Sequence, residues 1–276
     1  MLKLLRANFS RLWKAKIFWG AAALLALIGA AIPLKFLIDN RSGASAWTPD
    51  TACFTFAFLV PVLLSVLAAL FIGSEYSDGT MRNKCIVGHR RGSIYLADLI
   101  VCMAAGAMLC AAYLLPYLCL SLPLLGHFEA PVQAVLLYAG LNLLLTFAFA
   151  ALYTLTAILI QSKAHTTAAC ILLVFALLFA GVHITSALNE PEYYSAYSYT
   201  ENGVTVEAQD ERNPNYLTGT KRQVYEFLHD FTPGGQTLQL ANMNTEHPAR
   251  LALYSSLILL AASACGMLAF RRKDLK

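Results

Sequence analysis

The chain has 276 residues, of which 58% are hydrophobic and 13% are charged. Soluble domains carry about 25% charged residues, and a soluble core of this size could not bury so much apolar surface. The composition therefore excludes an ordinary soluble domain and indicates that a lipid bilayer surrounds most of the protein. The net charge of +4 is modest, and its distribution along the chain is more informative than its size.

Six segments are long and apolar enough to be transmembrane helices, since a span needs about 20 mostly apolar residues to cross about 30 Å of hydrocarbon. The first is too long for the apolar part of a typical signal peptide, and no small-residue cleavage site follows it. The sequence therefore predicts an all-α integral membrane protein with six transmembrane helices. The predicted spans are residues 17–38, 53–73, 94–125, 132–160, 167–188 and 251–270.

The distribution of Lys and Arg predicts which side of the membrane each connection faces. With the N-terminus inside, fourteen of the 20 Lys and Arg residues lie in inner segments and six in outer segments. This is the asymmetry that the positive-inside rule describes. Because the number of spans is even, we expect both termini to lie in the cytoplasm.

The spacing of apolar residues in 2–16 predicts an amphipathic helix in front of the first span. At about 100° per residue, the apolar residues Leu5, Phe9, Leu12 and Trp13 share one face with Leu2. We expect this helix to lie in the inner membrane interface, with its cations near anionic lipid headgroups. It is either an elbow helix that braces a moving bundle or a basic anchor that only sets the topology. The polar residues assigned to the opposite face are Lys3, Arg6, Ser10, Arg11 and Lys14.

Two connections are large, an inner one at residues 74–93 and an outer one at residues 189–250. The outer connection predicts a small extracellular subdomain between spans five and six, with a β-like stretch at 203–207. Its residues 220–231 predict a helix, because apolar residues recur there at helical spacing. The run Thr232-Pro233-Gly234-Gly235 is expected to end this helix. The apolar residues in question are Val224, Phe227, Leu228 and Phe231.

The inner connection has the features of a short surface helix. Asp78-Gly79 is a turn signal, Thr80 is a good N-cap for a helix that runs to about Val87, and Gly88 could end it. A span, a tight turn, a short helix and a return span would together form a rigid lever on the cytoplasmic side. The alternative is an ordinary loop that obeys the positive-inside rule.

Asp98 lies about one turn into the third span. Acidic residues within a membrane are candidates for function. The alternative is the ion-paired start of a helix, because Arg90 and Arg91 lie in the same inner region.

Two stretches carry a resemblance to a known family. Residues 72–100, IGSEYSDGTMRNKCIVGHRRGSIYLADLI, resemble permease subunits of type-2 ATP-binding-cassette transporters. The resemblance is to small permeases of Gram-positive bacteria that are linked to peptide-antibiotic export and self-protection. Residues 213–236, NPNYLTGTKRQVYEFLHDFTPGGQ, resemble the outer loop of the same group. The basic amphipathic start and the six-span layout agree with the family along the whole chain.

The resemblance implies a division of labour in a bacterial plasma membrane. Family members pair in the membrane, with a second copy or a related permease, and bind two cytoplasmic ATP-binding-cassette ATPase subunits. The loop between spans two and three carries the coupling helix that sits in a groove of the ATPase. Glu75 would anchor this loop, Gly79 would permit its turn, and the basic residues would meet the partner. The coupling residues implied here are Glu75, Gly79, Thr80, Arg82, Asn83 and Lys84.

The sequence contains no recognisable motif for an energy source of its own. It has no G-x-x-x-x-G-K-[ST] phosphate-binding loop, no H-E-x-x-H motif and no nucleophile elbow. Its histidines show no metal-binding spacing. We therefore expect that this chain is not an enzyme and holds no cofactor or metal, with ATP and Mg²⁺ bound by the partner subunit. We expect membrane lipid, and no nucleic acid, among its other partners.

The leading hypothesis is a permease subunit that exports a hydrophobic or amphipathic compound, such as a peptide antibiotic. A secondary transporter or channel would be expected to show midplane charges or broken helix pairs, and a membrane enzyme would be expected to cluster polar groups at helix ends. Neither feature is clear in the sequence. Two alternatives remain: an ATP-independent secondary transporter or channel, and a sensor or immunity protein that binds a peptide at its outer loop without moving it.

Overall fold

The computed structural model describes residues 1–43, 46–194, 198–201, 204–207 and 211–273. Six helices in these ranges are long and apolar enough to cross a membrane, which confirms the predicted fold class. Each predicted span lies inside one of them when the 3-10 turn η1 (Pro49–Ala52) is counted with the second. The spans are α2 (Lys16–Arg41), α3 (Phe56–Ser77), α5 (Arg91–Leu125), α6 (Val132–Ile160), α7 (Lys163–Leu188) and α10 (Pro248–Arg272).

The centre of the bundle is formed by α3 and α6, whose side chains are mostly buried, whereas α2, α7 and α10 expose most of theirs. The helix α2 packs along α5, and α10 packs along α6. Large apolar side chains such as Leu27, Leu172 and Phe179 are exposed on the outer helices. Exposed apolar side chains on backbone-satisfied helices fit a lipid-facing surface.

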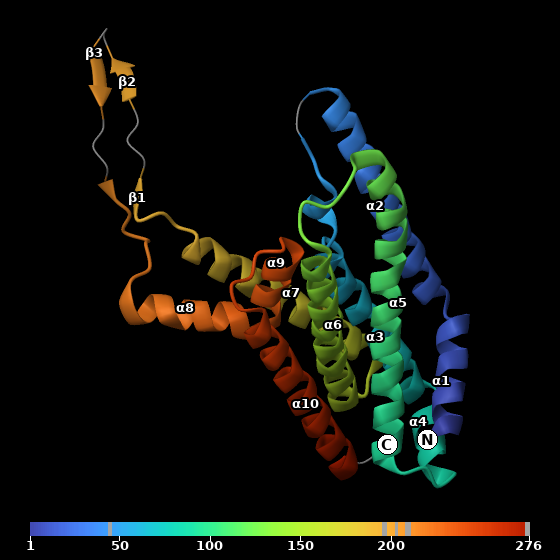
Figure 1. Ribbon diagram of the computed structural model, residues 1–276. Helices are drawn as coiled ribbons and strands as arrows, with labels where there is room; N and C mark the ends of the chain where they lie inside the picture. The colour runs from blue at the N-terminus through green and yellow to red at the C-terminus, as the bar shows by residue number, and fades with distance from the viewer. Residues whose placement is uncertain (44–45, 195–197, 202–203, 208–210, 274–276) are drawn as a thin grey trace.

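One end of the bundle gathers most of the Lys and Arg residues, and we call it the basic end. It holds α1 (Leu2–Lys14), α4 (Thr80–Ile86), the connection between α6 and α7, and the last turn of α10 (Figure 1). The opposite end holds the connections α2–α3 and α5–α6 and the whole segment between α7 and α10. The structure thus brings the segments that the charge pattern grouped as inner to one end.

The helix α1 packs beside α5 instead of presenting its whole apolar face to lipid. Ala15 is extended and separates α1 from α2. The face turned to the bundle is the i, i+4, i+8 stripe Leu4, Asn8 and Leu12, which is buried, while Trp13 is exposed. The prediction that Leu12 faces the membrane interface is therefore wrong, because its side chain belongs to the core of the protein.

The segment between α7 and α10 begins with two antiparallel strand pairs. The strand β1 (Tyr193–Tyr194) pairs with β4 (Glu211–Arg212), and β2 (Ser198–Glu201) pairs with β3 (Val204–Glu207). Figure 1 shows these strands as an arm that extends away from the bundle. The predicted β-like stretch agrees with β3, and its first residue, Gly203, lies outside the described residues.

Two helices follow the strands, of which only the first was predicted. The helix α8 (Gly219–Phe231) agrees with the predicted helix 220–231. The second, α9 (Pro233–Ala241), starts within the run that was expected only to end α8. The Thr232 hydroxyl accepts a hydrogen bond from the Gly235 backbone N–H at 3.2 Å, which caps α9, and Pro233 occupies the first turn, where proline is tolerated.

The helix α9 is buried against α3, α6 and α7. A Cβ atom on Gly234 would overlap the backbone carbonyl of Leu177, and one on Gly181 would overlap the Gly234 backbone. These two glycines let α7 and α9 touch through their backbones. The predicted extracellular subdomain at 189–250 is therefore corrected, because its last helix is part of the bundle.

Replacing Gly234 with Ala should destabilise the protein, since the new methyl group has no room beside Leu177. Overpacking of this kind costs about 1–3 kcal/mol. We expect a drop of several degrees in the apparent unfolding temperature of the purified protein in detergent. Gly140→Ala is the matched control, because nothing lies within 4 Å of the added atom. Equal unfolding temperatures for the two variants would contradict the close packing of α7 and α9.

Candidate functional site at the basic end

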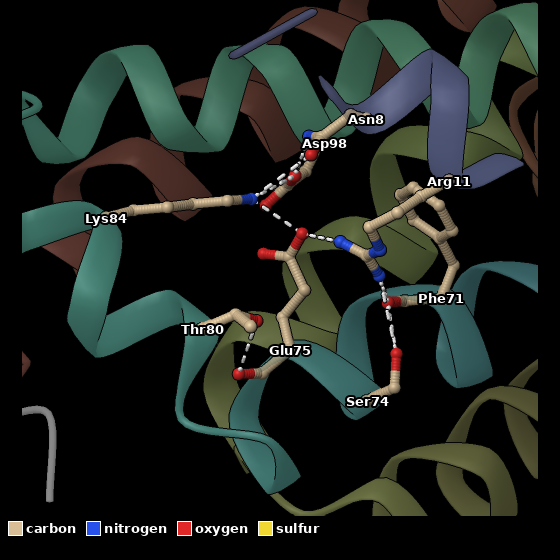
Figure 2. Close-up of polar contacts among 8 residues, drawn as sticks. All are labelled: Asn8, Arg11, Phe71, Ser74, Glu75, Thr80, Lys84 and Asp98. Carbon is tan, nitrogen blue, oxygen red and sulfur yellow. Dashed lines mark hydrogen bonds and ion pairs between the residues drawn. The ribbon is translucent and has the colours of Figure 1, made fainter. Parts of the chain in front are cut away.

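The centre of the site is Glu75, which lies in the last turn of α3 and has 1% of its surface exposed. A buried carboxylate is costly unless it is paired and hydrogen-bonded. Two cations from other helices meet its Oε1 atom. Arg11 of α1 pairs with it through Nη1, and Lys84 of α4 places Nζ at 2.6 Å (Figure 2).

The other terminal nitrogen of the Arg11 guanidinium binds the end of α3. This nitrogen, Nη2, donates to the Phe71 carbonyl oxygen at 2.7 Å and to Ser74 Oγ at 3.3 Å. The guanidinium carbon also lies 4.3 Å from the centre of the Phe71 ring, as in a cation–π contact. The prediction that Arg11 faces lipid headgroups is therefore wrong, because its donors are used within the protein.

A second buried carboxylate, Asp98 of α5, completes the site and has no exposed surface. Asn8 Nδ2 donates to Asp98 Oδ1 at 2.6 Å, and Lys84 Nζ donates to Asn8 Oδ1 at 3.2 Å. Lys84 Nζ also lies 3.8 Å from Asp98 Oδ1. Figure 2 shows that the side chains converge from α1, α3, α4 and α5. We call Asn8, Arg11, Glu75, Lys84 and Asp98 the charge cluster.

The alternative in which Asp98 pairs with Arg90 or Arg91 is not what the structure shows. Arg91 donates instead to the Phe270 carbonyl oxygen at 3.1 Å, in the last turn of α10. The Asp98 side chain points toward α1 and α4. Its partner Asn8 is close in space although the two residues are 90 positions apart in the sequence.

The pKa of the Lys84 amine is subject to opposing effects, and burial is the largest. Burial lowers the pKa of the Lys84 amine, and the nearby Arg11 charge lowers it too, while the Asp98 carboxylate opposes both by raising it. The cluster contains two acidic and two basic side chains, so their charges balance. Loss of either carboxylate would leave a cation with too few partners in a poorly solvated site.

The turn between α3 and α4 is built from two particular residues. Gly79 has φ +68°, a left-handed conformation that side chains disfavour, so the predicted turn at Asp78-Gly79 is present. Thr80 was predicted as the N-cap of α4, but the N-cap residue is Gly79. The Thr80 hydroxyl instead donates to the Glu75 carbonyl oxygen at 3.1 Å, which ties the start of α4 to the end of α3.

The helix α4 has one face toward the cluster and one free face. Met81 and Lys84 point inward, and Lys84 keeps only 15% of its side chain exposed. The prediction that Lys84 meets a partner is therefore wrong, because its amine is used inside the protein. Arg82 and Asn83 are exposed.

Sequence analysis missed part of the free face. Ile86 and Val87 are 71% and 76% exposed at the end of α4, outside every span. Two large apolar residues in a short connection beside charged ones are a signal that could have been noticed. Together with Arg82 and Asn83, they form what we call the α4 outer face.

Within the described part of the chain, no group of three or more His, Cys, Asp or Glu residues is placed to hold a metal ion. The charge cluster is instead internally paired. Its contacts join four helices, α1, α3, α4 and α5.

Comparison with known proteins identifies the family. Residues 4–182 match the family model described as "ABC-2 family transporter protein". The chain belongs to this family and is a membrane permease subunit of an ABC transporter. The match includes α1 from its third residue, all of α4 and every residue of the charge cluster, and the family implies an ABC ATPase as partner. Among curated proteins, none matches this sequence.

Replacing Glu75 with Gln should loosen α4, because Arg11 and Lys84 lose the charge that they share. Breaking a buried pair costs about 3–5 kcal/mol, and we expect the lower end because Arg11 is 37% exposed. Hydrogen exchange of the α4 amides should accelerate at least about tenfold. The control is Asp78→Asn, an exposed acid three residues away. Unchanged exchange in Glu75→Gln would show that the cluster does not hold α4.

Proposed function

We propose that α4 receives the motion of the ATPase and that the charge cluster passes it to α1, α3 and α5. The observation that carries this proposal is the two-faced construction of α4. Lys84 fastens its inner face to the buried carboxylates Glu75 and Asp98. Its outer face presents two exposed apolar residues and two polar ones, which is a suitable composition for contact with a protein partner.

The mechanism requires α4 to be rigid. Coupling between two sites needs an element that both sides contact and that has distinct arrangements. A helix of seven residues is marginal by itself. Held by Lys84 on one side and by Thr80 at its start, α4 becomes an extension of α3, so that a push on α4 displaces the ends of α3 and α5 together.

The orientation that this function needs has the basic end in the cytoplasm, with both termini there. The excess of Lys and Arg at this end supports it through the positive-inside rule. The charge cluster does not account for the excess, because it supplies only Arg11 and Lys84 of the fourteen Lys and Arg residues assigned to inner segments. An ATPase in the cytoplasm could then reach the α4 outer face.

The cargo in this proposal is a hydrophobic or amphipathic compound, such as a peptide antibiotic, moved out of the cell by a pair of identical or related permeases. Its support is the resemblance of residues 72–100 and 213–236 to small Gram-positive permeases. The broad apolar surface of α2 offers room for a second permease as well as for lipid.

The proposed contact with the ATPase is tested by placing charges on the α4 outer face. In the double variant Ile86→Glu/Val87→Glu, we expect the amount of co-purified ATPase to fall at least about tenfold, which corresponds to about 1.4 kcal/mol. Central apolar contacts of an interface commonly contribute that much. The control is His165→Glu, which adds an exposed charge at the same end but on α7. Undiminished ATPase binding to the double variant would refute the docking surface.

The proposed transmission is tested by Gly79→Val. A β-branched residue at φ +68° is strongly disfavoured, so the turn should deform while the spans still insert. We expect the ATPase to remain bound but ATP-dependent accumulation of a fluorescent amphipathic peptide in inside-out vesicles to be lost. Gly20→Val is the control, because its side chain meets open space on α2. Full accumulation with Gly79→Val would rule out this route of coupling.

A further inference from the structure

The helix α8 is amphipathic, yet none of its residues is buried by the rest of the described chain. At about 100° per residue, its apolar residues occupy an arc of about 100°. On this face, Val224 is 49% exposed, Phe227 is 50% exposed and Phe231 is 37% exposed. An amphipathic helix normally covers such a face with protein, so this face needs another partner.

The apolar face of α8 is turned toward the membrane-spanning part of α10. The rings of Phe227 and Phe231 pack edge-on against Tyr254, with ring centres 5.9 and 5.6 Å away. Tyr254 is six residues beyond Pro248, the first residue of α10, and so lies about 9 Å along that helix at 1.5 Å per residue. The exposed Phe227 and Phe231 side chains therefore point along the membrane-spanning helix α10 and not toward the strand arm.

The position of α8 in the fold agrees with this direction. Figure 1 shows α8 running across the direction of the long helices, at the level where α10 begins and below the outer ends of α2 and α5. It contacts both α7 and α10, and His183 of α7 lies near Tyr225, with ring centres 6.4 Å apart. The helix thus lies sideways at the level where two spans end.

The opposite face of α8 is polar and lines a pocket with the ends of α7 and α10, and Phe227 and Tyr254 line the same pocket. Arg222 pairs with Glu226 at 3.0 Å on this face, and Asp230 lies 3.9 Å from Arg250 of α10. Arg222, Glu226 and Asp230 thus pair with charged partners near the ends of α7 and α10. This division is the one that a helix in a membrane interface requires.

We propose that α8 is a membrane-surface helix, with Val224, Phe227 and Phe231 inserted at the boundary between lipid headgroups and acyl chains. Phe227 and Phe231 contact Tyr254 of α10, and Leu253 and Leu257, close to Tyr254 in the sequence of this span, are exposed apolar side chains. Tyr254 stands at the junction, and tyrosine is enriched at this depth. The inference rests on the membrane fold and does not depend on the coupling role of α4.

The occupant of this face is lipid and not a second copy of the chain. Stable protein interfaces bury about 800 Å² on each partner, and three partly exposed side chains on one short helix offer far less. By lying in the interface, α8 fixes the base of the strand arm at the membrane surface, since β4 precedes it and the buried α9 follows it.

The test is site-specific photocrosslinking in membrane vesicles of the full-length protein. The photoreactive residue p-benzoylphenylalanine is introduced at Val224 or Phe227 on the apolar face, and at Gln223 or Glu226 on the polar face as controls. After irradiation, intact-mass measurement of the purified protein should show an added phospholipid at positions 224 and 227, at least about fivefold more often than at 223 and 226.

A second variant tests the same point by comparing lipid labelling at one position with and without an added charge on the apolar face. With Phe227→Asp, the lipid adduct formed from position 224 should fall at least about fivefold, because a carboxylate opposes insertion. Equal lipid labelling on both faces would overturn the proposal. So would crosslinks from positions 224 and 227 that join two copies of the chain, since these would place a protein interface where we place lipid.

Discussion

The shared carboxylate of Glu75 is the interaction on which the basic end of this permease depends. Arg11 and Lys84 approach it from helices that are separated by most of the first third of the chain. Buried ion pairs often add little net stability, because desolvation offsets much of the attraction. Their value here lies in geometry, since few arrangements satisfy both cations at once. The cluster fixes where α1 and α4 lie relative to α3 and α5.

Each end of the bundle holds a short helix in place, and the two ends do so by different contacts. At the basic end, charges hold a short helix outside the spans. At the opposite end, α9 is held by backbone contact through Gly181 and Gly234 and by a buried hydrogen bond of 2.5 Å from Ser255 to Gln236. Backbone contact suits a part that stays fixed, whereas the buried charge cluster keeps its helices together, because separating its members would leave unpaired charges. This difference is consistent with motion entering at the basic end.

The sequence predicted what bilayer thickness and helical spacing determine, namely the six spans, α8 and the grouping of the basic connections. It could not predict the charge cluster, because contacts such as Asn8 with Asp98 join residues far apart in the chain. It also assigned Lys84 to the outside, since the periodicity of a seven-residue helix does not fix which face turns inward. The helix α9 was missed because Thr-Pro-Gly-Gly is both a helix stop and a capped helix start. Glu75 was singled out only through the family resemblance.

The central claim is that α1 and α4 move as one body when the ATPase acts. It is tested most directly by pulsed electron paramagnetic resonance. Spin labels are attached to ketone-bearing residues that replace Lys3 on α1 and Asn83 on α4, and the distance between the two labels is measured. The reconstituted transporter is measured without nucleotide and after vanadate trapping, with a third label at Gln133 at the opposite end. We predict a narrow Lys3–Asn83 distance that stays constant while both distances to Gln133 change. A change in the Lys3–Asn83 distance on trapping would contradict the account.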